Sequence, residues 1–147
     1  MNYWLVKSEP DAFSWDQQVA NGIEPWTGVR NHMAKNNLKA MKKGDLAFFY
    51  HSNIGKEIVG VVKVAREAYP DPSIEPDEKG DWVCTDMQAV GPMPHPVTLA
   101  AIKATPALAD VALVRMSRLS VMPIAPEHWK LLCTMGGWKS RRGTLSP

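Results

Sequence analysis

A chain of 147 residues, 45% of them hydrophobic, can bury enough apolar surface to form one domain without disulfide or metal support, and it is short for two. Its formal net charge of +2 is too small to indicate a nucleic-acid-binding protein by itself. Any evidence for such a role must come from how the charges are distributed along the chain. Two cysteines without CxxC spacing and four scattered histidines match no zinc pattern, and we expect neither a metal nor a cofactor.

The sequence opens without the charged and apolar regions of a signal peptide, and no apolar run approaches the roughly 18 residues of a membrane span. We therefore expect a cytoplasmic protein with no membrane partner, and we take a monomer as the default state.

The first half of the chain predicts strands and short helices in alternation. Ser14 can cap a helix, and the turn at residues 53–55 joins two hydrophobic runs into an antiparallel hairpin. The expected elements are a strand at residues 2–7, a helix at 14–20, a helix that follows Trp26 and ends near Met41, and strands at 46–51 and 57–67.

Prolines interrupt the second half. Residues 68–81 carry three prolines and no periodicity, which predicts a long loop, and Pro92, Pro94 and Pro96 are expected to end the strand at 82–90. The remaining expected elements are a helix at 98–103 capped by Thr98, an irregular or helical piece from Pro106, short strands at 113–116 and 119–122, and a helix at 126–135.

These elements predict an α+β fold of five or six mostly antiparallel strands, in a small curled sheet or barrel flanked by short helices. We assign residues 1–137 to the domain and residues 138–147 to a flexible basic tail.

The stretch at residues 26–31 combines residue types suited to nucleic acid. Gly28 permits a tight turn that holds Trp26 as a partly exposed stacking surface, and Arg30 and Asn31 can form paired hydrogen bonds. Residues 32–43 contain no acid. A loop tryptophan more often packs beside the core, and a lysine stripe is usually a solvated face. The combination nevertheless predicts phosphate binding by Lys35, Lys39 and Lys42.

Five blocks in order resemble the signature of the EVE domain family, and together they span roughly residues 2–135. They are Tyr3-Trp4-Leu5-Val6-Lys7-Ser8-Glu9-Pro10, Trp26-Thr27-Gly28-Val29-Arg30-Asn31, Phe48-Phe49-Tyr50-His51-Ser52-Asn53, Glu67-Ala68-Tyr69-Pro70-Asp71 and Arg118-Leu119-Ser120. The resemblance implies a PUA-like, barrel-like sheet, kinship with YTH domains, and a nucleic-acid pocket for a modified base, notably a methylated or hydroxymethylated cytosine.

The block matches also imply where the pocket lies. One residue departs from the familiar form of the second block, because Thr27 stands where that form carries Asp, which leaves the identity of the base open. A base can enter a pocket only from a single strand or by flipping out of a duplex of DNA or RNA. Trp82 and Tyr50 are candidates for a second aromatic surface. The expected base-pocket residues are Ser8, Trp26, Thr27, Arg30, Asn31, Tyr50, His51, Ser52, Trp82 and Arg118.

Other interpretations stay open at this point. His51 is explained equally well by a hydrogen bond to the backbone, and Glu9 by a helix cap. A hydrolase could combine His51 and Ser52 with Asp45 or Asp86, although no GxSxG motif surrounds the serine. A third possibility is a small-molecule sensor or interaction module with the same fold.

Overall fold

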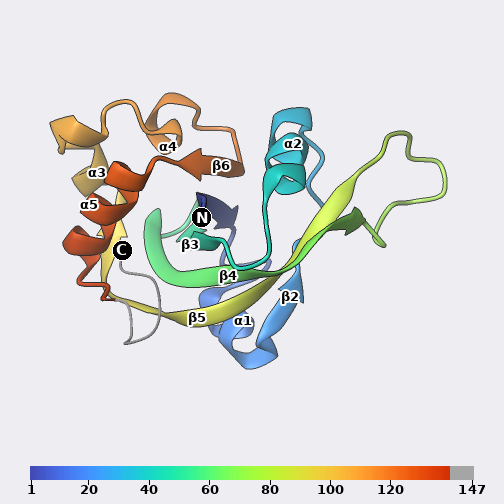
Figure 1. The fold of residues 1–147 in the computed structure, drawn as a ribbon, viewed down its shortest axis with the longest axis horizontal. Coiled ribbons are helices and arrows are strands. Elements are labelled where there is room, and N and C mark those ends of the chain that lie inside the picture. The colour runs from blue at the N-terminus through green and yellow to red at the C-terminus, as the bar shows by residue number, and fades with distance from the viewer. Residues whose placement is uncertain (140–147) are drawn as a thin grey trace.

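The computed structural model describes residues 1–139, which form one six-stranded sheet with short helices around it (Figure 1). The strand order is β2-β5-β4-β3-β1-β6, and only β1 and β3 run parallel. Since β2 and β6 remain as edges, the sheet is open. The α+β class is confirmed, with an open sheet in place of a closed barrel. The strands are β1 (Tyr3–Ser8), β2 (Ile23–Pro25), β3 (Leu46–His51), β4 (Glu57–Pro70), β5 (Val83–Thr98) and β6 (Val121–Ile124).

The helices begin at residues whose chemistry favours a helix start. The predicted caps at Ser14 and Thr98 are confirmed, because each side-chain oxygen accepts a hydrogen bond from the backbone N–H three residues further on. Gly137, at a φ of +70°, ends the last helix. None of the helices within residues 1–139 is long and apolar enough to cross a membrane. The helices are α1 (Trp15–Asn21), α2 (His32–Ala40), α3 (Leu99–Lys103), the 3₁₀ turn η1 (Pro106–Leu108), α4 (Ala112–Arg115) and α5 (Pro126–Gly136).

The sequence prediction was wrong about the proline-rich segments of β4 and β5. β4 continues to Pro70, which pairs with Val83, so only residues 71–82 form the connection. β5 runs through its three prolines to Thr98. Its second neighbour, β2, pairs only with residues 86–88, so the later part of β5 is an edge where a proline costs no sheet hydrogen bond on its open side. The end of β4 and the start of β5 form a two-stranded arm at the right of Figure 1.

The strand predicted at residues 113–116 was also wrong, because residues 113–115 belong to α4 and Met116 is its C-cap. Arg115 and Met116 donate their backbone N–H groups to the carbonyl oxygens of Val111 and Ala112, and β6 already occupies the edge of β1. A short apolar run does not distinguish strand from helix. The next predicted strand, at 119–122, forms two residues later as β6.

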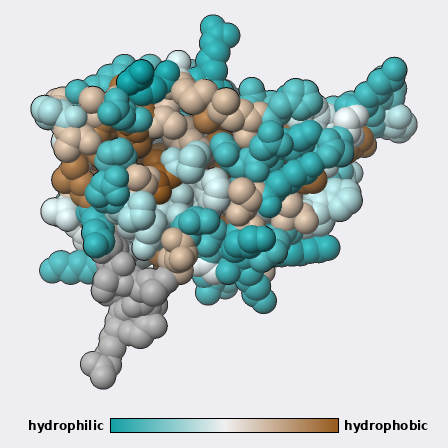
Figure 2. All heavy atoms as spheres, turned by 45° about the horizontal axis from the view of Figure 1, so that its top comes forward, coloured by the Kyte–Doolittle hydropathy of each residue, from teal (hydrophilic) through white to brown (hydrophobic). Residues whose placement is uncertain are grey.

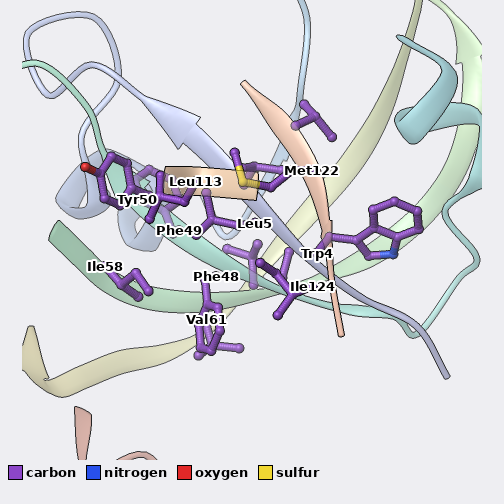
Figure 3. Packing of buried hydrophobic residues seen from close by; sticks show 14 of the residues in the cluster. Trp4, Leu5, Phe48, Phe49, Tyr50, Ile58, Val61, Leu113, Met122 and Ile124 are labelled. Atoms are coloured by element: carbon purple, nitrogen blue, oxygen red, sulfur yellow. The ribbon is translucent and has the colours of Figure 1, made fainter. Parts of the chain in front are cut away.

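The core fills both faces of the central strands (Figure 3). Phe48 and Phe49 are neighbours on β3 and therefore point to opposite faces. On one face Phe48 stacks on Trp129 of α5, with ring centroids 3.9 Å apart. On the other face Phe49 meets the rings of Trp15 and Trp26 at 5.3 Å and 5.6 Å. The Phe49 face is the one that carries the candidate site.

The surface divides along the length of the molecule. In Figure 2 hydrophilic side chains cover most of the β4–β5 arm, whereas hydrophobic residues gather on the opposite half, where α3 to α5 lie. The two cysteines, Cys84 and Cys133, are free and buried, as expected. Burial raises the pKa of the Cys133 thiol to about 12. Trp138, predicted to begin the tail, instead lies close to Gly91 and beside the core, while residues 140–147 lie outside the described residues.

Candidate functional site

A pocket of about 400 Å³ opens where the end of β1, the turn after it, and β2 meet. We call it the aromatic pocket. It contains three of the ten predicted base-pocket residues: Ser8, Trp26 and Thr27. Its full lining is Lys7, Ser8, Glu9, Ala12, Phe13, Glu24, Pro25, Trp26 and Thr27.

The pocket depends on a tight turn that follows β1. The backbone N–H groups of Ala12 and Phe13 donate to the carbonyl oxygen of Glu9, and the Ser8 hydroxyl donates to the carbonyl oxygen of Phe13. This turn brings Phe13 against Trp26 in an edge-to-face contact, with ring centroids 6.1 Å apart and an interplanar angle of 81°. Two aromatic rings at nearly right angles can contact both the face and the edge of a planar ligand.

Trp26 is more buried than the sequence suggested. Only 7% of its surface is exposed, and its backbone N–H donates to the carbonyl oxygen of Thr85 at 2.7 Å. The indole is therefore both a core residue, packed on Phe49, and part of the pocket wall. Truncation to alanine would remove core packing as well as ligand contact.

The pocket also holds charged groups that were not among the predicted base-pocket residues. Glu9 and Glu24 place two carboxylates in the lining, and Lys7 adds an ammonium group whose pKa is lowered by burial. Glu9 stands in the first family block, so its position beside Ser8 was a usable signal. Phe13 and Glu24 carried no such signal, because they reach the pocket through a turn and through the pairing of β2 with β5.

A second pocket, of about 360 Å³, lies between the start of α2 and the segment that follows α4. We call it the methionine pocket. It contains two further predicted residues, Asn31 and Arg118. Lys7 joins the two pockets, since its ammonium group donates to the carbonyl oxygen of Ser117 at 2.8 Å. The lining of the second pocket is Asn31, Met33, Arg115, Met116, Ser117, Arg118 and Leu119.

Asn31 has a structural task in addition. Its side-chain oxygen accepts the backbone N–H of Ala34 at 2.9 Å and caps α2. The helix therefore begins at His32, and Asn31 both caps it and lines the pocket.

Arg30 lies in neither pocket lining and binds two acids from the β4–β5 connection. Its guanidinium is 3.0 Å from Asp71 and 2.8 Å from Glu78. Burial opposes ionisation of Asp71, but hydrogen bonds from Ser73, the Gly28 backbone and Arg30 outweigh it and lower the pKa of the carboxyl to about 2. Asp71 thus fixes the turn at Gly28, which has a φ of +82°, and holds residues 26–30 in place.

The predicted lysine stripe meets an acid from the same connection. The ammonium groups of Lys35 and Lys39 lie 2.7 Å and 2.6 Å from the Asp81 carboxylate, whose pKa these two hydrogen bonds lower. Trp82 is stacked on His32, with ring centroids 5.0 Å apart, and lines neither pocket. Lys42 is exposed at the far end of the stripe.

The remaining predicted residues lie at the end of β3 and directly after it, outside both pocket linings. Nε2 of His51 accepts the backbone N–H of Trp15 at 3.0 Å, which is the backbone role considered above, and burial lowers the pKa of the imidazole. The Ser52 backbone N–H donates to the carbonyl oxygen of Ser8 at 2.9 Å. Tyr50 is buried at 3% exposure, with the Lys7 ammonium 5.9 Å from its ring.

The acids considered for a hydrolase triad are occupied elsewhere. Asp45 accepts the indole N–H of Trp4 at 3.0 Å, and Asp86 accepts the hydroxyl of Tyr69. Neither therefore orients His51. Within residues 1–139, no group of three or more His, Cys, Asp or Glu side chains is placed to hold a metal ion.

The fold is shared with a nucleic-acid-binding domain. The YTH domain of the Zygosaccharomyces rouxii MRB1 protein, solved in complex with N6-methyladenosine RNA, superposes with a TM-score of 0.58 over 92% of this chain and 86% of that chain. Because the two sequences are only 15% identical, the likeness concerns the fold alone. The YTH domain therefore supports only the expected type of fold.

The chain belongs to the EVE domain family, whose model matches residues 2–135. A Rhodopseudomonas palustris protein solved by NMR is 58% identical, with a TM-score of 0.88 over 97% of each chain. Human THYN1, thymocyte nuclear protein 1, is 33% identical, with a TM-score of 0.86 over 92% of this chain and 98% of that chain, and was solved in complex with DNA that contains 5-methylcytosine.

Proposed function

We propose that this protein is a non-catalytic nucleic-acid-binding module that takes one modified base, such as 5-methylcytosine, into the aromatic pocket. The observation that carries the proposal is the lining itself, which combines Phe13 and Trp26 with two carboxylates and an ammonium group. The structure of human THYN1 with DNA that contains 5-methylcytosine supports the choice of ligand.

Each part of the pocket suits one part of the base. A cytosine presents the N4 amino group as a donor, and a glutamate is a suitable acceptor for it. Glu9 and Glu24 supply that acceptor, while the Lys7 ammonium can donate to O2 or N3. The 5-methyl group gains apolar contact with the rings of Phe13 and Trp26. The departure at Thr27 therefore does not deprive the pocket of a carboxylate.

Contacts with the base alone do not give enough binding free energy, so contacts with the rest of the strand are also needed. Extrusion of a base from a duplex costs a few kcal/mol, and stacking on one aromatic ring returns about 1–3 kcal/mol. Further affinity must come from phosphate contacts, for which Lys7, Arg118 and Lys42 are available. Lys35 and Lys39 can join them only by exchanging Asp81 for phosphate. Single strands are the preferred ligand, because binding them requires no extrusion of a base from a duplex.

The test uses short labelled single strands that differ at one base: cytosine, 5-methylcytosine or thymine. We expect the methyl group to improve binding by about 10-fold or more, since one buried methyl is worth roughly 1–3 kcal/mol. Thymine keeps the methyl group but presents an acceptor at O4 in place of the N4 donor. A carboxylate in the pocket should therefore reject thymine, and affinity should fall with salt for every strand.

Two variants identify the carboxylate that reads the base. Glu9→Gln and Glu24→Gln each replace an acceptor by an amide, which can also donate to O4. The variant at the reading position should lose discrimination between 5-methylcytosine and thymine, whereas Glu127→Gln, an exposed change on α5, should keep it. Equal binding of all three bases by the unmodified protein would overturn the proposal. Unchanged discrimination in both pocket variants would remove the carboxylates from recognition.

A further inference from the structure

We infer that the methionine pocket is a second subsite, which takes the base of the nucleotide next to the modified one. The inference rests on the proposed function and adds a ligand to it. The subsite would give the protein a preference for sequence context beside the modified base.

The pocket exposes apolar surface that the fold does not use. Met33 and Met116 have 47% and 40% of their surface exposed, although both are large hydrophobic residues. Met33 comes from the first turn of α2 and Met116 from the end of α4, so two elements distant in sequence present thioether groups to one cavity. Methionine sulfur makes favourable contacts with aromatic rings and adapts to rings of different shape.

The polar lining is that of a site for a nucleotide. It offers the Asn31 amide and the guanidinium groups of Arg115 and Arg118, and it includes no carboxylate, in contrast to the aromatic pocket. Arg115 is held by Asp110 at 2.9 Å. Arg118 forms no ion pair within residues 1–139 and is exposed. An amide and a guanidinium can bind base edges or phosphate oxygens.

The position of Lys7 links the two subsites. Lys7 lines the aromatic pocket, and its ammonium group donates to Ser117, which lines the methionine pocket. The chain also connects them through residues 27–31, since Thr27 faces the first pocket and Asn31 the second. A strand with one base in the aromatic pocket would place the adjoining phosphate at Lys7 and the neighbouring base between the two methionines.

The experiment compares single strands that carry one 5-methylcytosine and a single abasic nucleotide on its 5′ side, on its 3′ side, or at a distant position. Anisotropy titration gives each affinity. Loss of the base that occupies the methionine pocket should weaken binding by about threefold or more, which is the lower range for two methionine–ring contacts. The distant abasic nucleotide should have no effect. Equal affinity for all three strands would overturn the inference.

Variants then locate the effect. Met33→Ala combined with Met116→Ala should bring the affinity ratio between the intact and the adjacent abasic strand close to one, while the preference for 5-methylcytosine over cytosine is kept. The matched control is Ile54→Ala, an exposed apolar residue in the β3–β4 turn that lines neither pocket. A double variant that keeps the full abasic penalty would contradict the assignment. Failure of the proposed function is distinct, because the unmodified protein would then show no methyl preference on the intact strand.

Discussion

Substitution of Asp71 by asparagine should destabilise the protein and loosen the turn that carries Trp26. The Asp71 side chain is fully buried and accepts four hydrogen bonds, from the Gly28 backbone, the Arg30 guanidinium, and the backbone and hydroxyl of Ser73. An asparagine of the same shape has one acceptor oxygen and one amide nitrogen, so one pair of donors would face another donor.

The magnitude follows from the carboxyl pKa. The pKa of Asp71 falls from its ordinary value of 3.8 to about 2 in the folded protein. Because each pKa unit is worth about 1.4 kcal/mol, the ionised form contributes about 2 kcal/mol to the free energy of unfolding at pH 7. The folded-state pKa lies below the unfolded-state value. The contribution is therefore complete above about pH 4, is lost as the pH falls toward 2, and has dropped by about 1 kcal/mol at pH 3.

Urea denaturation followed by tryptophan fluorescence measures both effects. At pH 7 Asp71→Asn should lower the free energy of unfolding by about 2 kcal/mol, and the difference from the unmodified protein should shrink by about half at pH 3. Asp77→Asn changes an exposed acid of the same connection and should have little effect at either pH. A difference for Asp71→Asn that is the same at pH 7 and pH 3 would refute the reasoning.

Three further changes test other contacts. Asp81→Asn should release the two α2 lysines that Asp81 binds. If these lysines reach phosphate, oligonucleotide affinity and its salt dependence should both rise in binding titrations. Unchanged titrations would place the two lysines outside the interface. His51 has a lowered pKa in the folded protein, so the unfolded state takes up a proton first and stability should fall as the pH drops below about 6.5. His51→Gln keeps an acceptor for the Trp15 N–H and should flatten that dependence between pH 7.5 and 5.5. Urea midpoints of the variant and the unmodified protein that change in parallel with pH would contradict this. Gly60→Ala would place a methyl group 2.5 Å from the Trp15 ring and should cost about 1–3 kcal/mol, measured by thermal unfolding, whereas an unchanged melting temperature would show that the ring can move.

The sequence was sufficient where local chemistry decides the structure. The caps at Ser14 and Thr98, the hairpin of β3 and β4, and the glycine after α5 all follow from rules that act over a few residues. The sequence was insufficient where the pairing of distant strands decides the structure. The prolines of β5 are tolerated because that stretch is an edge, and β6, not the apolar run at residues 113–116, pairs with β1. Neither fact is visible before the strand order is known.

The candidate site divides in the same way. The family blocks located Ser8, Trp26 and Thr27, but they did not separate the aromatic pocket from the methionine pocket. The charge pattern of α2 was clear in the sequence, whereas its neutralisation by Asp81 depends on how the β4–β5 arm folds back on the helix. Two pocket residues, Phe13 and Glu24, enter through tertiary structure alone. The cytoplasmic location and the monomeric state stay predictions.

The most direct test of the account is to observe the methyl group of the base inside the aromatic pocket. A single strand with one 5-methylcytosine carrying a ¹³C-labelled methyl group would be titrated with the protein and followed by NMR. Ring currents of Phe13 and Trp26 should shift the methyl proton resonance upfield on binding, with nuclear Overhauser contacts to both rings. A strand that binds to saturation while its methyl resonance keeps the free position and shows no contact to either ring would contradict the central claim.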